Sequence, residues 1–415
     1  MLRRPIIAPV RPPLPQLLAR DPVGPLALPW ESGDSFARAI ALTSLSFSRV
    51  GERSYLVDAS ATPMRWAATN VLRLEDRGDG AGPLVLLERS ATNPVLFSED
   101  FANAAWALVS TPTITANTAT APDGDVDADT IDDNSAVAAE RVRQTPVLGG
   151  VGNVVASLYI LRAAAAPPFP AIFYQGGGDY AAALNPLTGA SSAVAPFAAP
   201  SAIDVDTAGS AWWHLHMRRP SVVGAAFDIA PAFANPIGTF DSAVLGSAQF
   251  WGAHVEDGQN YCTSYLRTTG AIVTAGADNL AGQMPAWFFT ESGRFAQYSP
   301  GFASTDLVAG DIRWLFTIGA ATDGVRLRHV GGNVVLEAVQ ANVVRASSGA
   351  LVFVDNALLG EVRWNPRQGT VSVGGVAGAA GTAWAWTAGT VRFGGIQGGS
   401  GNELDGRLSQ IVEHV

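Results

Sequence analysis

Short apolar segments separated by turn residues constrain the fold of this chain more than any other feature. Gly, Pro, Ser and Thr interrupt the apolar runs, and none approaches the roughly 18–20 residues that a membrane-spanning helix needs. At Leu45–Arg49 apolar and polar residues alternate with the period of a strand. Many short segments bounded by Gly and Pro are typical of β-sandwiches and jelly rolls. We therefore expect an all-β protein with less than about a tenth of its residues in helices.

The length of the chain predicts more than one domain, because 415 residues exceed a single ordinary core. Residues 1–30 are rich in Pro and carry two early arginines, Arg3 and Arg4, which predicts an extended attachment arm that becomes ordered on a partner. Tandem β-sandwich or jelly-roll domains are expected to follow this arm. We place a small N-terminal β region at 31–92, a jelly roll at 93–266, a linker at 267–280 and a second sandwich at 281–415. The clearest predicted strands are Val151–Ile160, Ala211–Met217, Ser247–Val255, Val325–His329 and Val334–Val339.

Charge and composition exclude some functions and favour self-association. The net charge of −10 argues against nucleic-acid binding, which relies on a basic face. Cys262 is the single cysteine, which excludes an intrachain disulfide and a cysteine-cluster metal site. Hydrophobic residues make up 48% of the chain and charged residues only 15%, so apolar surface should be left over for contacts between subunits. We expect a homo-oligomer, with no membrane insertion.

Three segments together resemble structural proteins of phages and gene-transfer agents. They are LLERSATNPVLFSEDFANAAW and its continuation to residue 131, SAWWHLHMRR at 210–219, and FWGAHVEDGQNYCTSYLRTTG at 250–270. The matching positions in the first are Glu88, Thr92, Asn93, Ser98, Glu99, Asp100, Phe101, Asn103, Trp106, Ala121–Gly124 and Ala128–Asp129. Those in the third are Trp251, Gly252, Ala253, Glu256, Gly258, Thr263, Ser264, Tyr265 and Thr268. The chain departs from the pattern at His254, where Gln is usual, and at Leu266–Arg267, where Ile-Pro is usual.

The resemblance implies a tail-fibre or head-spike protein with a carbohydrate-binding-module-like jelly roll. It implies a position on the surface of a virion or phage-like particle assembled in the bacterial cytoplasm, and adhesion to a host surface polysaccharide. The N-terminal arm would contact other virion proteins, and by analogy the oligomer would be a trimer. The C-terminal part resembles, more loosely, a laminin-G or concanavalin-like sandwich. The family supplies no catalytic residues.

Tryptophans are the candidate carbohydrate-binding residues, because flat aromatic rings suit the apolar faces of sugars. Trp212 and Trp213 are adjacent, so in a strand they point to opposite faces. Trp384 and Trp386 are two apart and share a face between Gly-rich segments. The alternative for each is core packing.

Two polar patterns are candidate metal sites. Asp123, Asp125, Asp127 and Asp129 alternate, and so dense a run can supply oxygen ligands to Ca²⁺; the alternative is a solvated acidic loop that needs no cofactor. His214 and His216 would share one strand face, as Zn²⁺ or Ni²⁺ ligands do, but the sequence shows no third ligand.

The sequence leaves two alternatives to a glycan-binding virion protein. One is a purely architectural base or collar subunit that contacts only other virion proteins. The other is a glycan depolymerase or esterase, which the lack of a catalytic motif disfavours, although paired carboxylates cannot be recognised from sequence. We expect no enzymatic activity.

Overall fold

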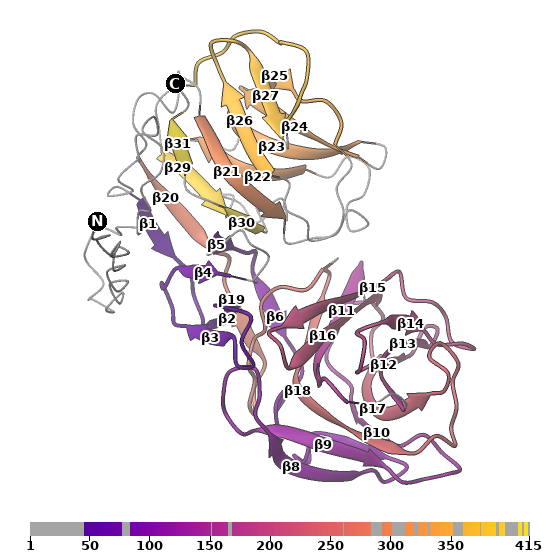
Figure 1. Cartoon of the computed structure of the whole chain (residues 1–415). Coiled ribbons are helices and arrows are strands. Elements are labelled where there is room, and N and C mark those ends of the chain that lie inside the picture. The colour runs from indigo at the N-terminus through magenta and orange to yellow at the C-terminus, as the bar shows by residue number, and fades with distance from the viewer. Residues whose placement is uncertain are drawn as a thin grey trace, which may run out of the picture.

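The computed structural model describes residues 45–76, 84–150, 152–164, 168–259, 261–283, 293–300, 312–318, 323–330, 333–351, 360–373, 375–386, 390–394, 406–408 and 411–413. These residues contain no helix, and 54% of them lie in strands of antiparallel sheets, which confirms the all-β prediction for this part of the chain. The strands form two β-sandwiches with a short hairpin region between them (Figure 1). The attachment arm predicted at 1–30 lies outside the described residues.

The first sandwich packs two six-stranded sheets face to face. Sheet I has the order β14 (Ser191–Ala193), β13 (Tyr180–Leu184), β12 (Phe169–Gln175), β17 (Ala226–Ala234), β10 (Arg141–Gln144) and β7 (Ala107–Val109). Sheet II has the order β15 (Ala202–Ala208), β16 (Trp212–Pro220), β11 (Asn153–Leu161), β18 (Gly246–Asp257), β9 (Ala128–Asp133) and β8 (Thr113–Ala119). The chain passes repeatedly from one sheet to the other, as in jelly rolls.

The second sandwich is built from a seven-stranded and an eight-stranded sheet that enclose a second core. Sheet III has the order β1 (Leu45–Ser48), β20 (Asn279–Gln283), β29 (Thr390–Gly394), β22 (Ile312–Ile318), β23 (Asp323–Val330), β24 (Asn333–Gln340) and β25 (Val343–Ser347). Sheet IV has the order β28 (Val376–Ala377), β27 (Thr370–Val373), β26 (Gly360–Asn365), β21 (Gly293–Pro300), β30 (Gly406–Leu408), β5 (Leu84–Leu87) and β4 (Arg73–Glu75), and β31 (Ile411–Glu413) also pairs with β21.

Strand pairing crosses the domain boundaries that we predicted. β1, from the predicted N-terminal region, pairs with β20, and β5 pairs with β30, so both belong to the C-terminal sandwich. The predicted linker contains β19 (Val273–Ala275), which pairs with β6 (Ala91–Asn93). The first sandwich is therefore inserted between strands of the second, because the chain leaves the second sandwich after β5 and returns to it at β20.

A buried ion network lies where the chain passes between the sandwiches. Arg73 pairs with Glu88 at 2.7 Å and also with Asp278, while Arg53 pairs with Glu88 and Arg49 with Asp278, each at 3.1 Å. The three arginine side chains are fully buried. Burial alone would raise the pKa of Glu88, but the charges of Arg73 and Arg53 outweigh it and hold that pKa well below its usual range.

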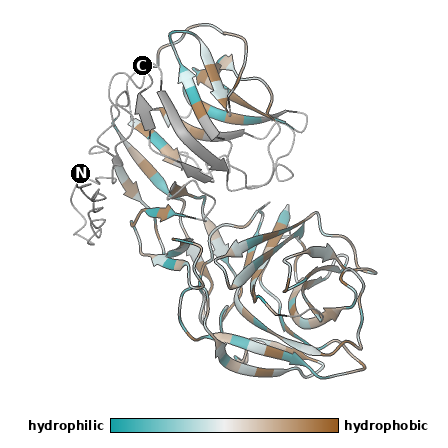
Figure 2. Cartoon of the chain, in the orientation of Figure 1, coloured by the Kyte–Doolittle hydropathy of each residue, from teal (hydrophilic) through white to brown (hydrophobic). Residues whose placement is uncertain are grey.

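The outer face of sheet II is covered rather than exposed. β2 (Arg53–Leu56) and β3 (Met64–Ala67) form a hairpin, and Met64 of this hairpin packs with Trp212, Trp251 and Tyr265 in a separate hydrophobic cluster. Figure 2 shows hydrophobic and hydrophilic residues interspersed along the strands of both sandwiches. Cys262, in the segment that follows β18, also lies over this face, with its Sγ 3.3 Å from Ser157 Oγ of β11.

Candidate functional site

The residues that carry the phage-protein resemblance converge in the structure, although they come from distant segments. The side-chain amide of Asn93 donates to the carbonyl oxygens of Ala253 at 3.1 Å and Leu266 at 2.9 Å, and its oxygen accepts the N–H of Val255 at 3.2 Å. This fully buried asparagine thus fastens the first segment to the third. Its role is structural, because the amide satisfies backbone groups that would otherwise be buried without partners.

A second set of these residues closes the same junction. The hydroxyls of Ser98 and Tyr265 lie 2.6 Å apart, and Ser98 Oγ accepts the N–H of Thr268 at 2.9 Å. The Asp129 carboxylate is buried and accepts the N–H groups of Phe101 and Asn117 at 2.8 and 2.9 Å. Asp129 is therefore occupied by backbone N–H groups and does not belong to the cluster of Asp123, Asp125 and Asp127.

Three of the four candidate carbohydrate-binding tryptophans are buried. Trp212 is 0% exposed beneath the β2–β3 hairpin, and Trp384 and Trp386, 5% and 3% exposed, pack in the core of the second sandwich. Their rings thus offer no free face to a sugar, and core packing, the alternative reading, describes them.

Trp213 is the remaining candidate, and it is half-buried. The Arg162 guanidinium carbon lies 3.8 Å from the centre of its ring, and the indole N–H donates to the carbonyl oxygen of Pro186 at 2.9 Å. A side chain at Gly189 would collide with the ring, since its Cβ would lie 2.6 Å from ring carbons. The indole is therefore held rigidly beside the core between the two sheets and carries a stacked cation.

The structure brings together three of the four candidate calcium ligands. Carboxylate oxygens of Asp123, Asp125 and Asp127 lie within 4.8 Å of one another. Residues that the sequence did not single out for this site complete the surroundings: Arg267 pairs with Asp123 at 2.5 Å and with Glu99 at 2.9 Å. The Trp66 indole N–H also donates to Asp123, at 3.2 Å. The Arg267 cation thus already neutralises part of the acidic group, which consists of Glu99, Asp123, Asp125 and Asp127.

Two carboxyl groups in this acidic group hold their protons unusually tightly. Burial, opposed by Arg267 and reinforced by Asp127, raises the pKa of Glu99 to about 7. Burial and the neighbouring Asp123 raise the pKa of Asp127 to about 6. The acidic group can therefore take up protons near neutral pH, or exchange them for a cation.

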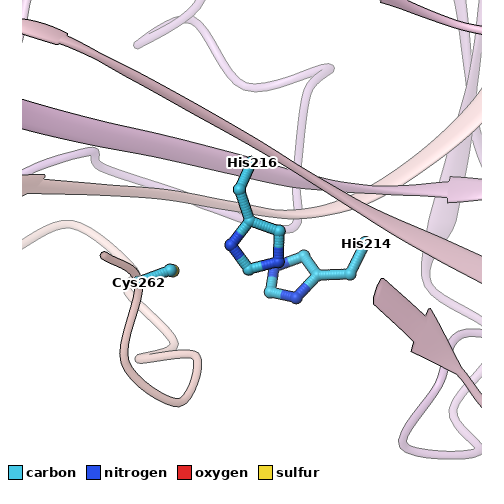
Figure 3. Close-up of side chains that lie close together, drawn as sticks. All are labelled: His214, His216 and Cys262. Carbon is cyan, nitrogen blue, oxygen red and sulfur yellow. The ribbon is translucent and has the colours of Figure 1, made fainter. Parts of the chain in front are cut away.

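His214 and His216 acquire a third neighbour that sequence reasoning missed. Ligand atoms of the two histidines and of Cys262 lie within 4.8 Å of one another (Figure 3). Cys262 lies in the segment after β18, far from the histidines in sequence. The strand period places the two histidines on one face, but no signal in the sequence connects them with this cysteine.

In comparisons with known proteins, no family model and no curated protein matches this chain. In the part of the chain that the structure describes, no helix has the length and apolarity that a membrane crossing requires.

Proposed function

We propose that the chain is a structural subunit of a phage-like particle, a fibre or spike protein that mediates adhesion to a host surface glycan. The observation that carries the proposal is the convergence of Asn93, Ser98, Tyr265 and Thr268, which belong to the resembling segments, in one buried network. Such convergence is expected where a shared sequence pattern encodes a shared sandwich. Adhesion is favoured over a purely architectural role because Trp213 and Arg162 form a rigid aromatic and cationic pair, and Trp213 is the one candidate tryptophan that is only partly buried.

Binding of the purified full chain to an array of bacterial surface polysaccharides tests the adhesive role. We expect binding to glycans that carry carboxylates, since Arg162 lies against Trp213 and can contact an acidic sugar. Trp213→Ala should weaken binding at least about tenfold, or about 1.4 kcal/mol. Trp213→Phe keeps an aromatic ring and is the matched control, expected to retain most of the affinity.

Absence of binding to every polysaccharide would contradict adhesion. If antibody labelling then places the chain on particles, the architectural alternative holds. Release of reducing ends from a bound polysaccharide would instead support the depolymerase alternative.

We also propose that Asp123, Asp125 and Asp127 bind Ca²⁺. The ion would displace the protons that Asp127 and Glu99 bind near neutral pH. Exposed Asp125 is free to complete the coordination, while Arg267 competes for Asp123, so the affinity should be modest. Adding calcium to about ten times its Kd at neutral pH should stabilise the fold by about 1.4 kcal/mol and raise the melting temperature by a few degrees.

The calcium prediction has a matched pair of variants. Asp125→Asn should abolish the calcium-dependent rise in melting temperature, whereas Asp132→Asn, in β9 and outside the acidic group, should leave it intact. An equal rise in both variants would place the calcium effect elsewhere, and no rise in the unmodified chain would leave the loop as a solvated acidic turn.

A further inference from the structure

A row of polar side chains crosses the outer face of sheet II, which is the face turned away from the core between the two sheets. Strand register aligns Asp204, His216, Ser157 and His254 across β15, β16, β11 and β18. Cys262 lies over this row, with its Sγ 3.3 Å from Ser157 Oγ and 3.7 Å from His254 Nδ1. His216 and His254 of this row thus lie near one thiol, and histidine and cysteine are residue types that bind Zn²⁺.

Rigid elements hold the two histidines that face this thiol. His214 and His216 are two residues apart on β16, so their side chains leave the same face of the strand. The ring of Tyr159 stacks on His214 with centroids 3.9 Å apart and planes within 4° of parallel. Asp206 lies 3.5 Å from His216 Nε2, where a carboxylate can orient the imidazole as second partners of metal-bound histidines do.

The spacing of the ligand atoms suits a small tetrahedral ion. Zinc bonds of about 2.0–2.3 Å place neighbouring ligand atoms roughly 3.3–3.8 Å apart. His214, His216 and Cys262 offer atoms within 4.8 Å of one another, so side-chain movements of about 1 Å would close the site. In Figure 3 the ring of His216 lies between the ring of His214 and the side chain of Cys262.

We propose that His214, His216 and Cys262 bind one Zn²⁺ ion, with water in the fourth position. Nitrogen and sulfur ligands in a tetrahedral set select Zn²⁺ over Ca²⁺ and Mg²⁺, which take oxygen ligands. The site is distinct from the acidic group and independent of glycan adhesion.

A second set of ligands shares the same thiol but is already occupied. His254, Glu256 and Cys262 also lie within 4.8 Å of one another. Glu256, however, accepts the N–H and O–H of Thr263 at 2.6 and 2.9 Å and pairs with Arg89 at 3.2 Å. His254 is 0% exposed, whereas His216 and Cys262 are only partly buried. The geometry therefore favours the β16 histidines.

Cobalt titration of the full chain, prepared without a histidine tag and free of metal, tests the proposal. We expect one Co²⁺ per chain, with the visible absorption of a tetrahedral ion and a thiolate-to-cobalt charge-transfer band, and full displacement by one equivalent of Zn²⁺. Cys262→Ser should abolish the charge-transfer band, and His216→Ala should weaken binding at least about tenfold. His254→Gln, which removes a ligand of the second set only, should still bind one Co²⁺ and show the charge-transfer band.

Three results would overturn the proposal. They are the absence of stoichiometric cobalt binding, a spectrum typical of an octahedral ion, or loss of binding in His254→Gln with retention in His216→Ala, which would assign the ion to the second set. Circular dichroism and thermal unfolding of each metal-free variant separate ligand loss from misfolding. If His216→Ala unfolds, His214→Gln takes its place in the comparison, because it also removes a ligand of the proposed set and keeps a polar side chain of similar size.

Discussion

Replacing Arg73 with Met is expected to lower the free energy of unfolding by about 3–5 kcal/mol, because it leaves two buried carboxylates without their shared partner. The Arg73 guanidinium contacts Glu88, Asp278 and the hydroxyl of Ser264, the last at 2.8 Å. Methionine fills a similar volume but donates no hydrogen bond. The remaining partners, Arg53 and Arg49, each reach only one of the carboxylates.

Urea unfolding measures this effect, and Arg65→Met is the matched control. Arg65 is exposed on β3 and donates only to backbone carbonyl oxygens of its own hairpin, so its loss should cost less than about 0.5 kcal/mol. Equal shifts of the urea midpoint in the two variants would show that the buried network contributes no more than a surface arginine.

The same network makes the protein sensitive to acid. Because the pKa of Glu88 in the folded state lies below its unfolded value of 4.5, the ionised group stabilises the fold above that pH. This contribution is lost as the pH falls below about 4.5, because Glu88 then binds a proton in the unfolded chain before it does so in the folded protein. The Arg73→Met variant should show less of this acid sensitivity than the unmodified chain.

Local patterns in the sequence predicted strands well and their partners poorly. Val151–Ile160 and Ser247–Val255 correspond to β11 and β18 because side-chain alternation and turn residues are local signals. The pairing of β1 with β20, and of β5 with β30, depends on contacts between residues that are hundreds of positions apart. No periodicity within one segment encodes such a partner, and so the predicted division at 31–92 and 267–280 did not anticipate the inserted sandwich.

The candidate sites show the same limit. Trp212 and Trp213 do point to opposite faces, as adjacent strand residues must: Trp212 joins the outer cluster and Trp213 packs against the inner core. The sequence could not show that the β2–β3 hairpin covers the outer face and buries Trp212. Likewise, the acidic run was visible as a local pattern, but Arg267 and Trp66 reach it only through the tertiary fold.

Replacing Glu99 with Gln is expected to change how stability depends on pH. The folded-state pKa of Glu99, about 7, lies above the unfolded value of 4.5, so the folded protein binds more protons than the unfolded chain between these values. Stability therefore falls as the pH rises through this window. Glutamine mimics the neutral carboxyl and can still accept from Arg267 and Tyr265, which now donate to Glu99 at 2.9 and 3.1 Å.

The measurement is the difference in free energy of unfolding between Glu99→Gln and the unmodified chain at about pH 5 and pH 8, in buffers that contain a chelator. Relative to the variant, the unmodified chain should lose about 2–3 kcal/mol across this range, since each unit of pKa shift corresponds to about 1.4 kcal/mol. Burial lowers the pKa of His254 to about 4, which acts in the opposite direction, but it is common to both proteins and cancels in the difference. Glu52→Gln, at an exposed position, is the matched control. If the Glu99→Gln difference does not change with pH, the carboxyl group of Glu99 is ionised throughout this range, and Arg267 rather than burial controls its charge.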